Sequence, residues 1–197
     1  MKTRSIHKTT MPLLAMALGL SLVVASAVLA QQDEWNELNQ QAVKLYRQGK
    51  FAEGIPICQR AIELAEKIFG ADHANVAKSL DNLARLFGAQ KQYAEAESLY
   101  WRSLAIREKA LGPEHPDTVN SLYDLAFVCA SQTKCAEAEP LFKRLLSIKE
   151  KALGPEHPDV GASLGYLAKT YRKMGKTEEA LKLEERAKQI KSRLQSP

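Results

Sequence analysis

Apolar residues recur along the later part of the chain with the period of an α-helix. A first stripe, between residues 115 and 132, consists of Val119, Leu122, Leu125, Ala126 and Cys129. A second stripe, between residues 135 and 153, consists of Ala138, Leu141, Phe142, Leu145, Leu146 and Ile148. Spacings of three and four residues place each set on one helical face. The polar Gln-Thr-Lys segment between the stripes predicts a short turn, and therefore a helical hairpin.

The hairpin pattern repeats every 42 residues. The octamer ALGPEHPD occurs at residues 110–117 and again at 152–159, and a diverged copy, IFGADHAN, occupies residues 68–75. One core position of the repeat is occupied by Leu38, Leu80, Leu122 and Leu164, and a small-residue position by Ala42, Ala84, Ala126 and Ala168. A fixed step of this length predicts stacked repeats. We assign four units, residues 34–75, 76–117, 118–159 and 160–197.

The repeated residues also carry a family resemblance. The pattern Leu80-x2-Leu83-Ala84-x2-Phe87, followed by Tyr93-x2-Ala96-x3-Tyr100-x2-Ser103-Leu104, resembles the tetratricopeptide-repeat (TPR) motif. The 42-residue step and the LGPEHPD linker are similar to the kinesin-light-chain subclass. This resemblance implies an all-α, right-handed superhelical solenoid in which the first helix of each unit lines a concave groove. It also implies a protein that binds other polypeptides.

The outer units depart from the repeat pattern with polar residues. Gln41 replaces a core leucine in unit one, and Glu184 and Lys188 replace apolar residues in unit four. A terminal repeat has no neighbour to cover its outer face, so polar residues there keep it soluble. We therefore expect the array to end with these units.

Residues 1–30 have the pattern of a secretory signal peptide. Lys2, Arg4 and Lys8 are followed by an apolar stretch, and Val28 and Ala30 stand at the small-residue positions before a cleavage point at Gln31. The alternative is an uncleaved anchor in the inner membrane over residues 12–30, which are long enough to span a bilayer. Both interpretations predict export, to the periplasm or the medium.

The net charge of +5 does not indicate a nucleic-acid partner. Without residues 1–30 the chain has 25 basic and 23 acidic residues, and no run of Lys and Arg suited to following phosphates is present. Catalytic motifs are also lacking. Gly175-Lys176-Thr177 is preceded by a helical pattern and has no glycine at the position that a phosphate-binding loop requires. We predict no enzymatic activity and no cofactor.

One histidine recurs in each linker, at His73, His115 and His157. Equivalent helices of stacked repeats lie roughly 8–10 Å apart, whereas a metal ion holds its ligands within about 2 Å. The three histidines therefore cannot share an ion. We interpret them as residues at helix N-termini and predict no metal site.

The three cysteines, Cys58, Cys129 and Cys135, occupy repeat positions where sister units carry aromatic residues. Such positions are buried, so three core-filling thiols are one interpretation. The other is a disulfide between Cys129 and Cys135, which flank the same turn, because an exported protein meets oxidising conditions. Both interpretations stay open at the level of sequence.

The resemblance places a set of polar and aromatic residues on the concave side. The predicted peptide-binding residues are Asn39, Tyr46, Arg47, Lys78, Arg85, Asn120, Tyr123, Phe127, Lys169, Arg172 and Lys173. Six of them are basic, and Asp81 is the one acid at a groove position. Exposed aromatic residues on such a surface mark contacts. We therefore predict an exported adaptor that binds acidic, partly apolar peptide segments. The alternatives are a self-assembling structural protein and a membrane-tethered assembly factor.

Overall fold

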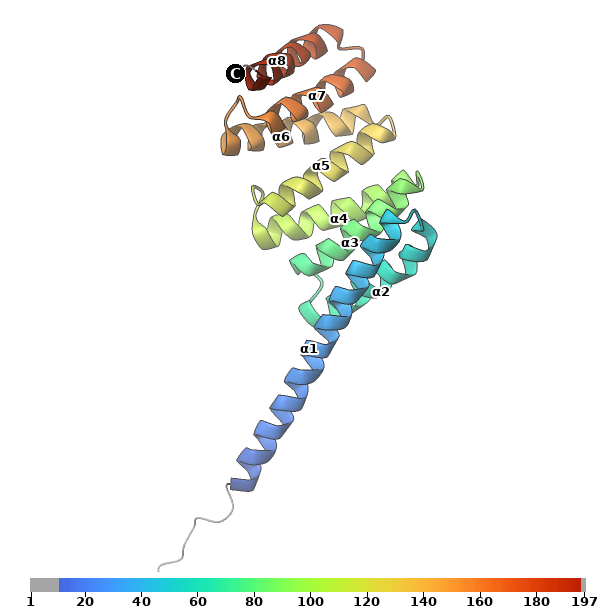
Figure 1. Cartoon of the computed structure of the whole chain (residues 1–197), viewed down its shortest axis with the longest axis vertical. Coiled ribbons are helices and arrows are strands. Elements are labelled where there is room, and N and C mark those ends of the chain that lie inside the picture. The colour runs from blue at the N-terminus through green and yellow to red at the C-terminus, as the bar shows by residue number, and fades with distance from the viewer. Residues whose placement is uncertain (1–10, 196–197) are drawn as a thin grey trace, which may run out of the picture.

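The computed structural model describes the backbone of residues 11–195 and the side chains of residues 26–193, and this part of the chain contains helices and no strand. The helices are α1 (Met11–Arg47), α2 (Phe51–Phe69), α3 (Ala74–Ala89), α4 (Tyr93–Leu111), α5 (Pro116–Ser131), α6 (Cys135–Leu153), α7 (Pro158–Lys173) and α8 (Thr177–Gln195). Each packs on the next, and α1 also contacts α3. The result is a single stack of helical hairpins (Figure 1). The predicted all-α solenoid is confirmed.

The helices keep the 42-residue step. The helices α3, α5 and α7 begin at residues 74, 116 and 158, and α2, α4, α6 and α8 begin at 51, 93, 135 and 177. The unit boundaries drawn from the sequence therefore lie two residues inside the first helices. The helices start earlier because the linker histidines cap them and proline suits the first helical turn.

The first helix is the exception to the repeat length. It runs without a break from Met11, so it extends beyond the compact stack (Figure 1). The predicted signal peptide falls partly on residues 1–10, which lie outside the described residues, and the rest of it belongs to the backbone of α1. Within the described residues, no helix combines the length and hydropathy needed to cross a membrane.

The linker histidines lie at helix N-termini, as the sequence predicted, and the structure shows that they cap these helices. Nδ1 of His73, His115 and His157 accepts a hydrogen bond from the backbone N–H two residues later, at 3.1–3.2 Å. Each cap satisfies a donor that the helix itself leaves without a partner. The glycines that end the preceding helices, Gly70, Gly112 and Gly154, have φ values of 88°, 92° and 86°. Glycine adopts this backbone without strain, so it stops the second helix of each unit.

The core runs through the stack between successive helices. Its fully buried members include the repeated Leu80, Leu122 and Leu164. Ala84 and Ala126 are also fully buried, and they let facing helices approach closely. Because each unit buries its apolar face only against its neighbours, the concave surface is positioned by inter-unit packing.

Ion pairs between second helices repeat along the array. Arg102, Arg144 and Arg186 pair with Glu66, Glu108 and Glu150, so that every pair joins one unit to the next. A second series joins linkers to second helices and includes Lys151 with Glu114. These groups are largely exposed and each pair contributes little. Their regular spacing nevertheless favours one stacking register.

Candidate functional site

A groove of about 720 Å³ opens between α1, α3 and α5. We call it the N-terminal groove. Its lining residues are Asn36, Asn39, Gln40, Val43, Lys44, Arg47, Gln48, Lys78, Asp81, Asn82, Arg85, Arg107, Asp117 and Asn120. The first helices of units one to three thus line it, as the family resemblance implied. Arg107 comes from α4 and forms part of the floor.

The floor of this groove is a buried ion pair. Arg107 Nη1 lies 2.7 Å from Asp81 Oδ2, and it also donates to the backbone carbonyl of Asp117 at 2.9 Å. Asp81 is 5% exposed and Arg107 is 7% exposed. These two charges largely offset each other. The single acid at a predicted groove position therefore adds little negative potential to the groove.

The rim of the N-terminal groove carries cations that no described acid neutralises. Lys44, Arg47 and Lys78 line it and form no ion pair with any residue whose side chain the structure describes. Lys78 Nζ lies 5.1 Å from the centre of the Trp35 ring, a cation–π contact that leaves its charge available. Arg85 differs, because it donates to Asp124 at 3.2 Å.

Asn39 borders the groove but is 3% exposed. Its amide donates to the Trp35 carbonyl at 2.8 Å, and its oxygen accepts from Asn82 at 2.9 Å and from Ser79 at 3.2 Å. The Trp35 indole N–H completes the network by donating to Ser79 at 2.9 Å. Asn39 therefore joins α1 to α3, and its hydrogen-bonding capacity is used inside the protein.

A second, smaller pocket of about 140 Å³ lies between α5 and α7. We call it the aromatic pocket. Its lining residues are Phe127, Ala130, Ser131, Phe142, Tyr166, Lys169, Thr170 and Lys173. Phe127 is 48% exposed, so its ring is open to solvent at the edge of the pocket. The rings of Phe142 and Tyr166 stack in parallel with centres 5.8 Å apart.

The polar groups around the aromatic pocket contact other groups of the protein, and no described acid pairs with Lys169 or Lys173. The Tyr123 hydroxyl donates to the Tyr166 hydroxyl at 2.8 Å, and burial together with this contact raises the pKa of Tyr123. Lys169 Nζ lies 5.8 Å from the centre of the Tyr166 ring, and Lys173 donates to the Ala130 carbonyl at 2.8 Å. This end of the concave face is consequently more apolar than the N-terminal groove.

The remaining predicted residues occupy different surroundings. Tyr46 is 42% exposed and lines a pocket of about 200 Å³ beside Arg47 and Arg85. Asn120 lines the N-terminal groove. Arg172 instead forms a bidentate pair with Glu184 of α8, with both bonds 2.6 Å long. Its guanidinium is thus committed to holding α7 against α8.

Several lining residues were not predicted from the sequence. Gln40, Asn82 and Tyr166 share one repeat position, adjacent to the predicted position of Asn39 and Asp81. Of these two adjacent positions, the TPR pattern assigns only the first to the groove. Arg107 lies on a second helix, where its counterpart in unit one is Ala65. Its counterparts in units three and four are Lys149 and Lys191, so the repeat alignment gave no signal that Arg107 would be buried.

All three cysteines are buried free thiols. The burial that their repeat positions predicted is confirmed, and the hypothesised disulfide between Cys129 and Cys135 is not formed in this structure. Burial raises the pKa of the Cys58 thiol to about 12. Burial and the nearby Glu97 and Glu137 carboxylates raise the pKa of Cys129 to about 11. Both groups are therefore neutral thiols at neutral pH.

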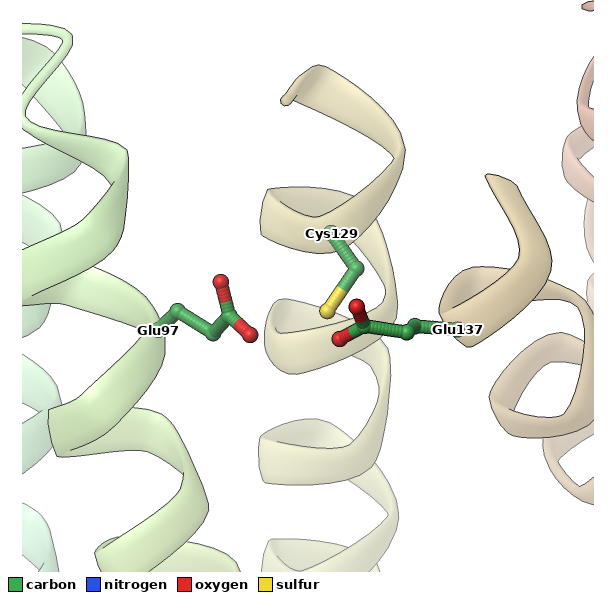
Figure 2. A group of neighbouring side chains, drawn as sticks. All are labelled: Glu97, Cys129 and Glu137. Atoms are coloured by element: carbon green, nitrogen blue, oxygen red, sulfur yellow. The ribbon is translucent and has the colours of Figure 1, made fainter. Parts of the chain in front are cut away.

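One group of side chains in the described part of the chain has the donor types of a metal site. The ligand atoms of Glu97, Cys129 and Glu137 all lie within 4.8 Å of one another. Figure 2 shows both carboxylates directed toward the Cys129 thiol. The prediction of no metal site considered only the recurring linker histidines, which this group does not include. These three residues come from three different helices.

The fold and its concave surface define a helical-repeat scaffold. The tetratricopeptide-repeat family matches residues 38–109, 88–151 and 125–193, and the chain belongs to this family. Proteins with this architecture are generally non-enzymatic scaffolds for protein–protein interaction. No curated protein matches the chain.

Solved structures support the same assignment. The chain is similar to kinesin-light-chain-type, nearly identical TPR-like repeats from Podosopora anserina, with 28% identity, a TM-score of 0.74, and coverage of 83% of this chain and 77% of that one. BtubC from P. vanneervenii has a TM-score of 0.76 at 19% identity, covering 83% of this chain and 65% of that one. MamA has a TM-score of 0.61 at 14% identity, with coverage of 86% and 85%. The last two show the fold alone.

Proposed function

We infer that this chain is an exported TPR adaptor whose concave surface binds an acidic, partly apolar segment of a partner protein. The observation that carries the proposal is the charge of the N-terminal groove. Five basic side chains line it against two acidic ones, and one of those acids, Asp81, is paired with Arg107. Lys44, Arg47 and Lys78 remain to pair with carboxylates of a partner.

The aromatic pocket supports the apolar part of the proposal. Phe127 offers an exposed ring at one side of the pocket, and Tyr166 closes another. Aromatic side chains bury a large area when a partner covers them, so they often contribute most to binding. An extended peptide that follows the concave face would place its acidic residues near α1 and α3 and an apolar residue near α5 and α7.

Export is supported by the sequence of residues 1–30, with their basic start, apolar centre and small residues before Gln31. The mass of the protein recovered from the exported fraction tests this part. A chain starting at Gln31 is expected for a cleaved signal peptide. A full-length chain in the membrane fraction would show the anchor instead, and a full-length chain in the cytoplasm would contradict export.

Peptide titration tests the binding proposal. Fluorescence anisotropy should show tighter binding of an acidic, aromatic-containing peptide than of a peptide in which every acid is replaced by lysine. The affinity should fall as salt rises, because the attraction involves exposed charges. Equal affinities for the two peptides at low and high salt would rule out the basic groove.

A matched pair of charge reversals locates the interaction. Lys78→Glu places a negative charge in the groove and should weaken acidic-peptide binding about tenfold or more. Lys182→Glu makes the same change in net charge on α8, away from both pockets, and should leave the affinity within about twofold. Equal losses in the two variants would indicate a general charge effect rather than a groove.

A further inference from the structure

The group of Glu97, Cys129 and Glu137 lies where units two and three meet. Glu97 is on α4, Cys129 is near the end of α5, and Glu137 is in the first turn of α6. Cys129 is 0% exposed and Glu97 is nearly buried, whereas Glu137 is exposed. The thiol stands between the two carboxylates (Figure 2). Three consecutive helices thus direct donor atoms toward one point.

The Cys129 thiol has no hydrogen-bonding side chain among the described residues. Glu97 Oε2 accepts from Lys134 at 2.7 Å and from the Gln132 amide at 2.6 Å. Although burial opposes it, these bonds hold the pKa of Glu97 below its usual value. The described residues therefore supply one ammonium group for two carboxylates, and they supply no side-chain hydrogen-bond partner for the sulfur.

The next junction of the array provides an internal comparison. There Glu139 occupies the position of Glu97, and Tyr171 occupies the position of Cys129. Glu139 accepts hydrogen bonds from Lys143 and Lys176, and the Tyr171 hydroxyl donates to it at 3.3 Å. Two ammonium groups and a phenol hydroxyl thus surround the Glu139 carboxylate and offset its negative charge.

The junction at Cys129 lacks two of these compensating groups. Trp101 replaces the lysine that corresponds to Lys143, and a thiol replaces the phenol. The same scaffold thus leaves one junction with excess negative charge and a sulfur atom where the other has a ring. Sulfur and two carboxylate oxygens are a ligand set suited to a thiophilic divalent cation.

We propose that Glu97, Cys129 and Glu137 form a binding site for one thiophilic divalent cation of the zinc class, with water as the fourth ligand. Metal–ligand bonds of about 2.0–2.3 Å bring ligand atoms to roughly 3.5 Å apart in a tetrahedral site. The three side chains must therefore close by about 1 Å. Glu137 is exposed on a first turn, so rotation of its side chain can supply this movement.

Charge balance is consistent with this site. On binding, the thiol gives its proton to solvent as the metal–sulfur bond forms, which is the usual coupling for cysteine ligands. One thiolate and two carboxylates then surround a doubly charged cation, and the Lys134 ammonium beside Glu97 balances the remaining charge. A cation there would tie α4, α5 and α6 together and so stiffen the middle of the concave face.

Cation binding is measured on the whole reduced chain after treatment with a chelator. Zn²⁺ titrated in competition with a chromophoric chelator should bind at one site per chain and raise the melting temperature. Co²⁺ should produce the sulfur-to-metal charge-transfer absorption of a thiolate complex. Mg²⁺ should do neither, because it prefers oxygen ligands alone.

Three variants remove one ligand each, Cys129→Ser, Glu97→Gln and Glu137→Gln. Each should weaken Zn²⁺ binding more than about tenfold, since even loss of an outer partner costs that much. Glu137→Gln alters an exposed residue, so its fold is expected to be intact and circular dichroism checks this. Cys58→Ser and Glu139→Gln are the matched controls and should bind as the unaltered chain does.

Three results would overturn the proposal. The first is no measurable Zn²⁺ binding by the unaltered chain. The second is binding that survives in Glu137→Gln with the Co²⁺ charge-transfer band unchanged. The third is binding that is lost on Cys135→Ser or Cys58→Ser but retained in Cys129→Ser, which would assign the cation to another thiol.

Discussion

The two halves of the concave face are built from the same repeat but differ in what they leave available. In the N-terminal groove, buried charges are paired at the floor, and Lys44, Arg47 and Lys78 at the rim form no ion pair with a described side chain. The aromatic pocket also has two lysines, Lys169 over the Tyr166 ring and Lys173 at the Ala130 carbonyl, and it adds the exposed Phe127 ring. One scaffold can thus present a paired floor with basic side chains at one end and an exposed aromatic ring at the other, with side chains alone making the difference.

Arg107→Ala should lower the stability of the protein more than any other change considered, because it breaks the buried ion pair beneath the N-terminal groove. It leaves the Asp81 carboxylate buried without its partner, and losses of about 3–5 kcal/mol are typical for such a change. Denaturant unfolding measures the loss. Lys149→Ala is the matched control at the equivalent position of the next unit, and it should change stability by no more than about 0.5 kcal/mol. A loss below about 1 kcal/mol in Arg107→Ala would contradict a structural role for the buried pair.

Phe127→Ala tests the apolar end. If the ring anchors a partner, the variant should lose about 2 kcal/mol of affinity for an acidic, aromatic-containing peptide. The electrostatic contribution to peptide binding should remain, so the salt dependence of the affinity should be unchanged. Trp101→Ala is the control, because Trp101 is exposed to a similar degree on a second helix. If the two variants bind the peptide equally well, the aromatic pocket is not a contact site.

Tyr123→Phe examines how rigidly the aromatic half is held. The change removes the hydrogen bond to the Tyr166 hydroxyl and should cost about 1 kcal/mol of stability. A double-mutant cycle with Tyr166→Phe separates this bond from the loss of each hydroxyl alone. Fully additive losses would mean that the two hydroxyl groups do not interact.

The repeat made most of the fold predictable from the sequence. The helical periods, the linker glycines and the capping histidines all recur at one step, so each unit confirmed the others. The burial of the cysteines followed from the same alignment, because Cys129 stands where sister units carry aromatic residues. At these positions the local preference for helix, turn or cap agrees with the packing of the repeats, and for this reason the sequence alone could predict them.

The state of individual side chains could not be predicted in the same way. Asn39 and Arg172 lie at groove positions of the repeat, yet Asn39 is buried in a network with Trp35 and Arg172 is bound to Glu184. Arg107 reaches the groove from a second helix. Such contacts depend on partners from other helices, and a repeat pattern fixes the position of a residue without fixing its partners. The cluster at Cys129 was missed for the same reason.

Glu139→Gln should have the smallest effect on stability, and the sign of its pH dependence distinguishes Glu139 from Asp124. Hydrogen bonds from Lys143 and Lys176 lower the pKa of Glu139 from 4.5 to about 2 in the folded protein. Between these two values the unfolded chain binds more protons, so stability is present above about pH 4.5 and is lost as the pH falls toward 2. The lysines are half exposed, and screening keeps the contribution under about 1 kcal/mol.

Removing the carboxylate should therefore flatten the loss of stability on acidification and leave the behaviour at neutral pH almost unchanged. Where α3 meets α5, burial raises the pKa of Asp124 despite the nearby Arg85. The folded protein then binds more protons than the unfolded chain, so Asp124 stabilises less as the pH rises above 3.8. Denaturant midpoints of Glu139→Gln and Asp124→Asn between pH 2 and 6 measure both trends. Slopes that change in the same direction in both variants would show that the pKa values of Glu139 and Asp124 are not shifted in opposite directions.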